Sequence, residues 1–162
     1  MVEQELYHDC YLYQEWTVDG CPAVLVSPRQ AAQGRPWIWR AEFFDAFPGV
    51  DLELLARGWH LAYLHVGNTF GCPEALAHWD PFYAQLTTDK GLAPRPVLEG
   101  LSRGGLYIYN WATCHPDQVC CLYGDAPVCD FKSWPGGRGR GPGSPADWQA
   151  LLEGYHFNSE AE

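Results

Sequence analysis

Positive charge is scarce in this sequence. Only 10 Lys and Arg residues stand against 20 Asp and Glu, and the formal net charge is −10 at pH 7. An acidic protein of this kind is repelled by the phosphate backbone of nucleic acids and by anionic lipid surfaces. We therefore expect neither a nucleic-acid partner nor a membrane partner.

Long apolar runs are also missing. No stretch approaches the roughly 20 apolar residues of a membrane-spanning helix, and the first thirty residues carry early acidic residues without the apolar core of a signal peptide. These absences predict a cytoplasmic protein.

Two kinds of ligand-binding pattern are absent as well. The seven cysteines are an odd number and include no C-x-x-C pair, which disfavours both a disulfide framework and a tetrahedral zinc site. No G-x-G-x-x-G or P-loop pattern occurs, so nucleotide binding is not expected. The sequence therefore predicts no metal and no organic cofactor.

What is present is an alternation of short apolar runs with amphipathic stretches over 162 residues, a length that fits one domain, residues 1–162. Extended patterns occupy residues 15–28, 36–40, 59–67, 95–102 and 119–130, and helical patterns occupy 50–58, 72–91 and 104–118. We read 15–28 as a hairpin that turns at Asp19-Gly20, and 119–130 as a buried strand that leads into a loop. This succession predicts an α/β fold with a mostly parallel, doubly wound sheet and flanking helices.

The composition changes near the end of the chain. Residues 132–145 form a Gly- and Pro-rich stretch that neither a helix nor a strand would tolerate, and we expect a loop there. Ser144 and Pro145 then have the chemistry of a helix N-terminus. Residues 145–162 are therefore predicted to form a helix and a polar tail.

The most informative stretch is "LEGLSRGG", in which Ser102 lies between Gly100 and Gly104. A strand is predicted before this stretch and a helix after it, so Ser102 would sit on a sharp turn at the carboxyl edge of the sheet. Ligand sites of open α/β sheets collect at that edge. The turn is predicted to require small residues at positions 100 and 104, because a side chain at either position would collide where the backbone doubles back.

From about residue 15 to residue 135 the sequence resembles the N-terminal part of the α/β-hydrolase superfamily, especially its esterase and prolyl-oligopeptidase-like members. The resemblance implies that Ser102 is the nucleophile and that the backbone N–H of Arg103 is one oxyanion donor. It implies a second donor near Arg40, in "RPWIWRAEFF". The implied reaction is acyl transfer to water, with a small-molecule ester favoured over a peptide.

The resemblance also implies an acid and a histidine base after the serine. Asp125 and Asp130 are candidate acids, although both also suit loop and capping roles. His115 would lie roughly 20 Å from Ser102 at about 1.5 Å per helical residue, which leaves His156 as the candidate base. No strand is predicted after His156 to carry a catalytic loop.

The alternative is therefore a C-terminally incomplete, truncated hydrolase-like domain that serves as a binding or interaction protein. Such a domain would form a homo-oligomer, or would need a partner chain that supplies the missing strands.

Overall fold

The computed structural model describes residues 5–157. A seven-stranded sheet in the order β1-β2-β3-β5-β4-β6-β7 forms its centre. The strands are β1 (Leu6–Tyr7), β2 (Tyr11–Val18), β3 (Cys21–Ser27), β4 (Trp37–Arg40), β5 (His60–Leu64), β6 (Val97–Leu101) and β7 (Cys121–Asp125). From β5 to β7 the strands are parallel, whereas β1, β2 and β3 are antiparallel to their neighbours. The predicted α/β class with a mostly parallel sheet is confirmed.

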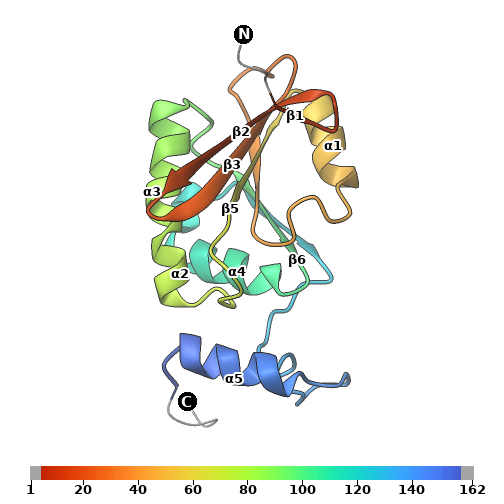
Figure 1. Cartoon of the computed structure of the whole chain (residues 1–162), viewed down its shortest axis with the longest axis vertical. Helices are drawn as coiled ribbons and strands as arrows, with labels where there is room; N and C mark the ends of the chain where they lie inside the picture. The colour runs from red at the N-terminus through yellow and green to blue at the C-terminus, as the bar shows by residue number, and fades with distance from the viewer. Residues whose placement is uncertain (1–4, 158–162) are drawn as a thin grey trace.

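Helices cover both faces of the sheet (Figure 1). They are α1 (Gly49–Ala56), α2 (Pro73–Ala77), α3 (Trp79–Ala84), a π-helix (Gln85–Asp89), α4 (Gly104–Cys114), a 3₁₀-helix (Pro116–Gln118) and α5 (Pro145–Gly154). The predicted break within 72–91 falls at His78, between α2 and α3. It precedes Pro81 because a proline lacks the N–H for the preceding turn and its ring collides with the carbonyl four residues earlier. None of the helices between residues 5 and 157 has the length and apolar composition needed to cross a bilayer.

Two apolar layers hold the sheet between these helices. On the α2, α3 and α4 face, Trp39 stacks on Trp79 with ring centroids 4.2 Å apart and meets Trp111 edge-on at 5.1 Å. On the α1 face, Ile38 and Leu61 pack with Leu55. Alternate residues of β4 thus point to opposite layers, as the two-residue period of a strand requires.

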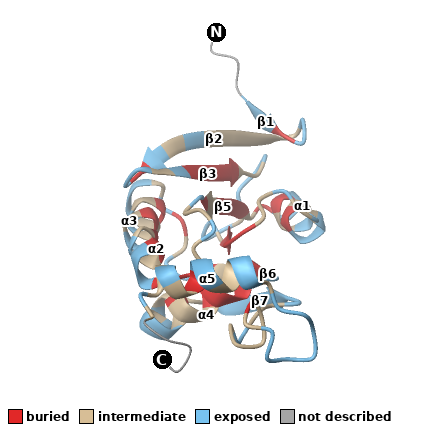
Figure 2. Cartoon of the chain, turned by 60° about the horizontal axis from the view of Figure 1, so that its bottom comes forward, coloured by how far each residue is buried: buried red, intermediate tan, exposed pale blue. Residues whose placement is uncertain are grey.

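The helix α5 lies at the carboxyl edge of the parallel strands, against the start of α4 (Figures 1 and 2). Its buried Leu151 packs with Phe70 and Leu106. The predicted start of this helix is confirmed, with Ser144 at the N-cap and Pro145 in the first turn. The Ser144 hydroxyl does not cap the backbone, because it donates to Asp147 Oδ2 at 2.6 Å.

The prediction of a buried strand at 119–130 is wrong in one respect. The strand β7 does form beside β6, but all five of its residues are exposed (Figure 2). At this edge of the sheet, apolar side chains such as Leu122 and Tyr123 lie in solvent, at 38% and 37% exposure, although α4 contacts the strand. Composition alone does not distinguish such an edge from a buried strand.

Candidate functional site

Ser102 occupies the turn between β6 and α4, at the carboxyl edge of the sheet. Its backbone has φ +51°, in the left-handed region that residues other than glycine seldom adopt. The Ser102 N–H donates to the Asp125 carbonyl at 2.9 Å, and the Ser102 carbonyl accepts from the N–H groups of Gly105 and Val128 at 3.1 and 2.8 Å. These bonds hold the strained turn from both sides and leave Ser102 exposed.

The glycines around Ser102 are not equally constrained. A Cβ at Gly100 would lie 2.8 Å from both the carbon and the oxygen of the Gly104 carbonyl. A Cβ at Gly105 would lie 2.5 Å from the Val128 carbonyl oxygen, whereas one at Gly104 would approach nothing closer than 3.5 Å. The collision predicted at Gly100 is confirmed, but a Cβ at Gly104 would make only ordinary contacts, so the collision predicted there is wrong. Gly105 is the second position where the close approach of the backbone excludes a side chain.

The start of α4 brings a second segment to the turn. Arg103 is the N-cap of α4, and the hydrogen bonds of the first turn begin with the N–H groups of Gly105 and Leu106, which donate to the carbonyls of Ser102 and Arg103. The N–H groups of Arg103 and Gly104 precede these bonds and have no acceptor within the helix. The loop after β4 lies beside this first turn: a Cβ at Gly104 would be 3.8 Å from the backbone nitrogen of Glu42. The backbone of Arg40 itself is in register with Tyr63 and Glu99 within the sheet. The loop residue nearest the turn is thus Glu42, two positions after Arg40.

The side chains of Glu42 and Arg103 form an ion pair between these two segments. Arg103 Nε donates to Glu42 Oε2 at 2.6 Å, and the two side chains are only 23% and 7% exposed. The Arg103 guanidinium also lies over the Phe43 ring, 4.8 Å from its centroid. Burial, reinforced by the nearby Glu42 carboxylate, raises the pKa of Tyr63 to about 12, so this neighbouring phenol stays protonated at neutral pH.

Arg40 is buried behind the same loop, at 1% exposure. Its guanidinium donates to the carbonyls of Glu42 and Phe43 at 3.2 and 3.1 Å and also to the carbonyl of Ala46. It forms an ion pair with Asp51 on α1 and reaches Glu99 Oε1 at 3.3 Å. The Arg40 side chain therefore ties the loop after β4 to α1 and to β6.

Glu99, the second carboxyl group beside Arg40, has a raised pKa. Burial, together with the neighbouring Asp51 carboxyl, raises the pKa of Glu99 to about 8, while the Arg40 guanidinium acts in the opposite direction. One oxygen of each carboxyl, Asp51 Oδ1 and Glu99 Oε2, is buried without a hydrogen-bond partner. A proton held between the two carboxyls would satisfy both atoms.

The remaining candidate acids and bases are distributed around the turn. Asp125 ends β7 and meets Ser102 through its backbone carbonyl. Asp130 accepts from the Lys132 N–H at 2.9 Å, the loop role that was the alternative for it. His156 lies 3.2 Å from Glu74 with its side chain 76% exposed, and His115 lies 3.3 Å from Asp80. Within residues 5–157 the Ser102 hydroxyl has no side-chain hydrogen-bond partner, so the structure does not bring a base to it.

Sequence reasoning missed four residues of this region: Glu42, Asp51, Tyr63 and Glu99. For Glu42 and Glu99 the available signal was weak: each is an acidic residue within or just after an apolar run, in "WRAEFF" and "VLEGLS". Charged residues at such positions are seldom buried unless they are paired. Their partners, however, come from distant parts of the chain.

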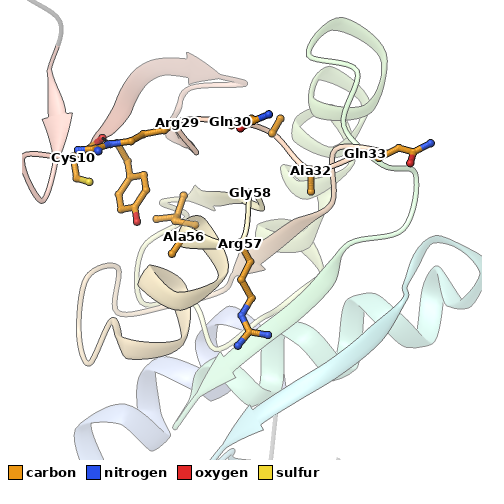
Figure 3. Close-up of a pocket in the computed structure, with 11 residues that line it drawn as sticks. Cys10, Arg29, Gln30, Ala32, Gln33, Ala56, Arg57 and Gly58 are labelled. Atoms are coloured by element: carbon orange, nitrogen blue, oxygen red, sulfur yellow. Dashed lines mark hydrogen bonds between the residues drawn. The ribbon is translucent and has the colours of Figure 1, made fainter.

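No group of three or more His, Cys, Asp or Glu residues in the described part of the chain could hold a metal ion. Two hollows in the surface lie away from Ser102. One, of about 650 Å³, is bordered by Arg29, Gln30 and Arg57 near the start of β2 (Figure 3). The other, of about 570 Å³, lies between α2 and α4 and is lined by Trp111 and Tyr155 among others. Neither hollow includes Ser102 or Glu42.

Comparison with known proteins gives structural neighbours only. No family model matches the chain, and no curated protein matches it. Among solved structures, oligopeptidase B from Trypanosoma brucei superposes with a TM-score of 0.62 at 16% identity over 79% of this chain and 22% of its own. A lipase/esterase from Lactobacillus plantarum gives 0.61 at 13% identity over 90% of this chain and 71% of its own. An α/β hydrolase from Novosphingobium aromaticivorans gives 0.52 at 18% identity, over 70% of this chain and 43% of its own.

The chain spans 38% and 44% of two further neighbours, an epoxide hydrolase and a lipase-type protein. At these identities the likeness concerns the fold alone. The chain therefore has the α/β-hydrolase fold, over part of the length that these proteins have.

Proposed function

We propose that this chain is the part of a serine hydrolase that carries the nucleophile, with Ser102 attacking the carbonyl carbon of a small neutral ester. The observation that supports this most is the left-handed backbone of an exposed serine at a strand-to-helix turn. A non-glycine residue kept in a strained conformation is typical of functional sites. The serine is exposed and directly precedes Arg103, the N-cap of α4, where the first N–H groups of a helix have no acceptor within it.

The chemistry follows from this arrangement. Ser102 Oγ forms a bond to the carbonyl carbon and loses its proton to a base, while the carbonyl oxygen becomes an oxyanion. Backbone N–H groups of Arg103 and Glu42 would donate to that oxyanion, an interaction that is worth about 3–4 kcal/mol per donor in related sites. The alcohol then leaves with a proton, and water hydrolyses the acyl-serine to release the acid.

The base is the part of this proposal that the described residues do not supply. All six histidines of the chain contact groups other than the Ser102 hydroxyl. His65 follows β5 at the same sheet edge as Ser102, but its Nδ1 faces the Tyr63 hydroxyl at 3.0 Å. The proposal therefore needs either a rearrangement of His156 or His65 or a base from another chain.

Labelling with a fluorophosphonate tests the nucleophile directly. The purified chain is incubated with the probe, alongside Ser102→Ala and the control Ser133→Ala, and the labelled residue is identified by peptide mass spectrometry. We expect labelling at Ser102 in the wild type and in Ser133→Ala and none in Ser102→Ala. A folded wild type that is not labelled would overturn the proposal that this chain by itself carries an activated Ser102.

A second candidate function is an interaction domain that pairs with another chain through β7. Its supporting observation is that all five residues of this edge strand are exposed, because open edges readily accept another strand. Sedimentation of the wild type and of Leu122→Lys at several concentrations tests it. Self-association that Leu122→Lys abolishes would support the candidate, and a monomeric wild type would exclude pairing between copies.

A further inference from the structure

The two proposed oxyanion donors come from segments far apart in the sequence. Glu42 lies in the loop after β4 and Arg103 at the start of α4, 61 positions later. Donors must lie about 2.7–3.1 Å from the oxyanion to be effective. A loop that moved by a few tenths of an ångström relative to α4 would therefore lose much of this stabilisation.

The side chains of these same two residues connect the segments. The bond from Arg103 Nε to Glu42 Oε2 is 2.6 Å long, and the Glu42 side chain is 7% exposed. A charge-assisted hydrogen bond of this length is among the stronger polar contacts in proteins. Its low exposure also protects it from the solvent screening that weakens surface pairs.

The loop needs such a connection because its backbone is strained. Phe43, Asp45 and Phe47 all have positive φ values, of +53°, +64° and +52°. Backbone of this kind persists only where surrounding contacts over-determine it. Arg40 supplies contacts from behind by binding the carbonyls of Glu42 and Phe43. The Glu42–Arg103 pair supplies the contact on the side of the turn.

We propose that the Glu42–Arg103 ion pair is a positioning device that holds the two oxyanion donors at a fixed distance from each other. The proposal rests on the proposed function, because it assigns a purpose to the side chains of residues whose backbones would do the chemistry. It gives the side chains no direct contact with the substrate. Removing the pair should therefore slow the chemical step without weakening the initial binding of the probe.

The test is a double-mutant cycle on the labelling kinetics. Glu42→Gln, Arg103→Met and the double variant are compared with the wild type, and the maximal labelling rate is separated from the probe concentration that gives half of that rate. We expect each single variant to lower the maximal rate by about tenfold, which is less than the loss of a whole donor. The double variant should be no slower than either single variant, because one interaction is lost in all three.

A matched control is available on α1. Glu53 and Arg57 form an ion pair of 2.7 Å whose side chains are 62% and 68% exposed. Glu53→Gln and Arg57→Met should leave the maximal rate unchanged. Thermal unfolding of every variant identifies a merely structural effect, in which stability falls while the labelling rate of the folded protein is unchanged. That result, or additive losses in the double variant, would overturn the proposal.

Hydrogen exchange separates this proposal from the proposed function. If the wild type is not labelled at all, the serine-hydrolase assignment fails, but the backbone amides of residues 42–47 still report on the ion pair. Glu42→Gln and Arg103→Met should both accelerate exchange in this segment relative to the α1 controls. Unchanged protection in both variants would show that the pair does not hold the loop.

Discussion

Replacing Gly100 by alanine tests the central geometric argument, that the turn at Ser102 forms only because the backbone of α4 approaches β6 closely. The added Cβ would lie 2.8 Å from the carbonyl carbon and oxygen of Gly104 and 2.8 Å from Ile108 Cδ1. Favourable carbon contacts begin at about 3.5 Å. Two of the three atoms belong to the backbone, so a side-chain rotation cannot relieve the clash.

The magnitude follows from the kind of adjustment required. Overpacking in a well-packed site costs about 1–3 kcal/mol, and we expect Gly100→Ala to fall near the upper end because the first turn of α4 must move. For a protein of this size each kcal/mol corresponds to about 2–4 °C in Tm, so the expected decrease is roughly 5–10 °C. The same displacement would move the Arg103 N–H and slow any labelling of Ser102.

Gly104→Ala is the matched comparison. Its Cβ would make ordinary contacts, the nearest at 3.5 Å from Glu42 Cβ, and alanine is favoured over glycine in a helix by about 1 kcal/mol. Urea and thermal unfolding followed by circular dichroism should therefore show a stable Gly104→Ala beside a destabilised Gly100→Ala. If the two variants were equally stable, whether both kept the wild-type stability or both lost it, the reasoning from close approach would be refuted.

Two further predictions concern the turn and the buried carboxyls. Ser102→Gly should have a free energy of unfolding about 0.5–1 kcal/mol higher than Ser102→Ala, because glycine relieves the positive φ at some cost in entropy. Denaturant titration of both variants measures this difference. Equal stabilities would mean that the turn is unstrained. The folded-state pKa of Glu99 is raised from 4.5 to about 8, so its protonation stabilises the fold below about pH 4.5, and this contribution is lost as the pH rises toward 8. Between these two pH values the free energy of unfolding should therefore fall as the pH rises, by up to about 1.4 kcal/mol per pH unit. The fall should be shallower in Glu99→Gln than in the surface control Glu53→Gln. Parallel pH profiles of the two variants would contradict the raised pKa of Glu99.

Much of the fold could be predicted because local signals and tertiary structure agree. Asp19-Gly20 between two extended runs specifies the β2–β3 hairpin, and both residues have positive φ there. The Gly100–Gly105 region could be placed between a strand and a helix for a similar reason. The glycine spacing around Ser102, however, pointed to Gly104, whereas the structure requires glycine at position 105. The sequence motif contains no information about the loop at Val128, which packs against α4.

The unpredicted features depend on partners that are distant in sequence. The run "CCLYGD" has the apolar content of a buried strand, and only the strand order reveals that β7 lies at an open edge. Glu42 and Arg103 become partners because α4 starts beside the loop after β4. No local pattern specifies either relation, since both are set by the crossover that places β4 between β5 and β6.

The charges around Ser102 also bear on which substrate suits the proposed reaction. The arginine in the turn and the arginine at the end of β4 are both engaged, Arg103 with Glu42 and Arg40 with Asp51 and Glu99. Two cations therefore face three carboxyls, and the raised pKa of Glu99 favours keeping one of these protonated. The cluster is then close to neutral and presents no uncompensated cation to an anionic substrate. Charge that develops on a carbonyl oxygen would have to be met by backbone N–H groups, which favours a neutral ester over a substrate that carries a carboxylate or phosphate.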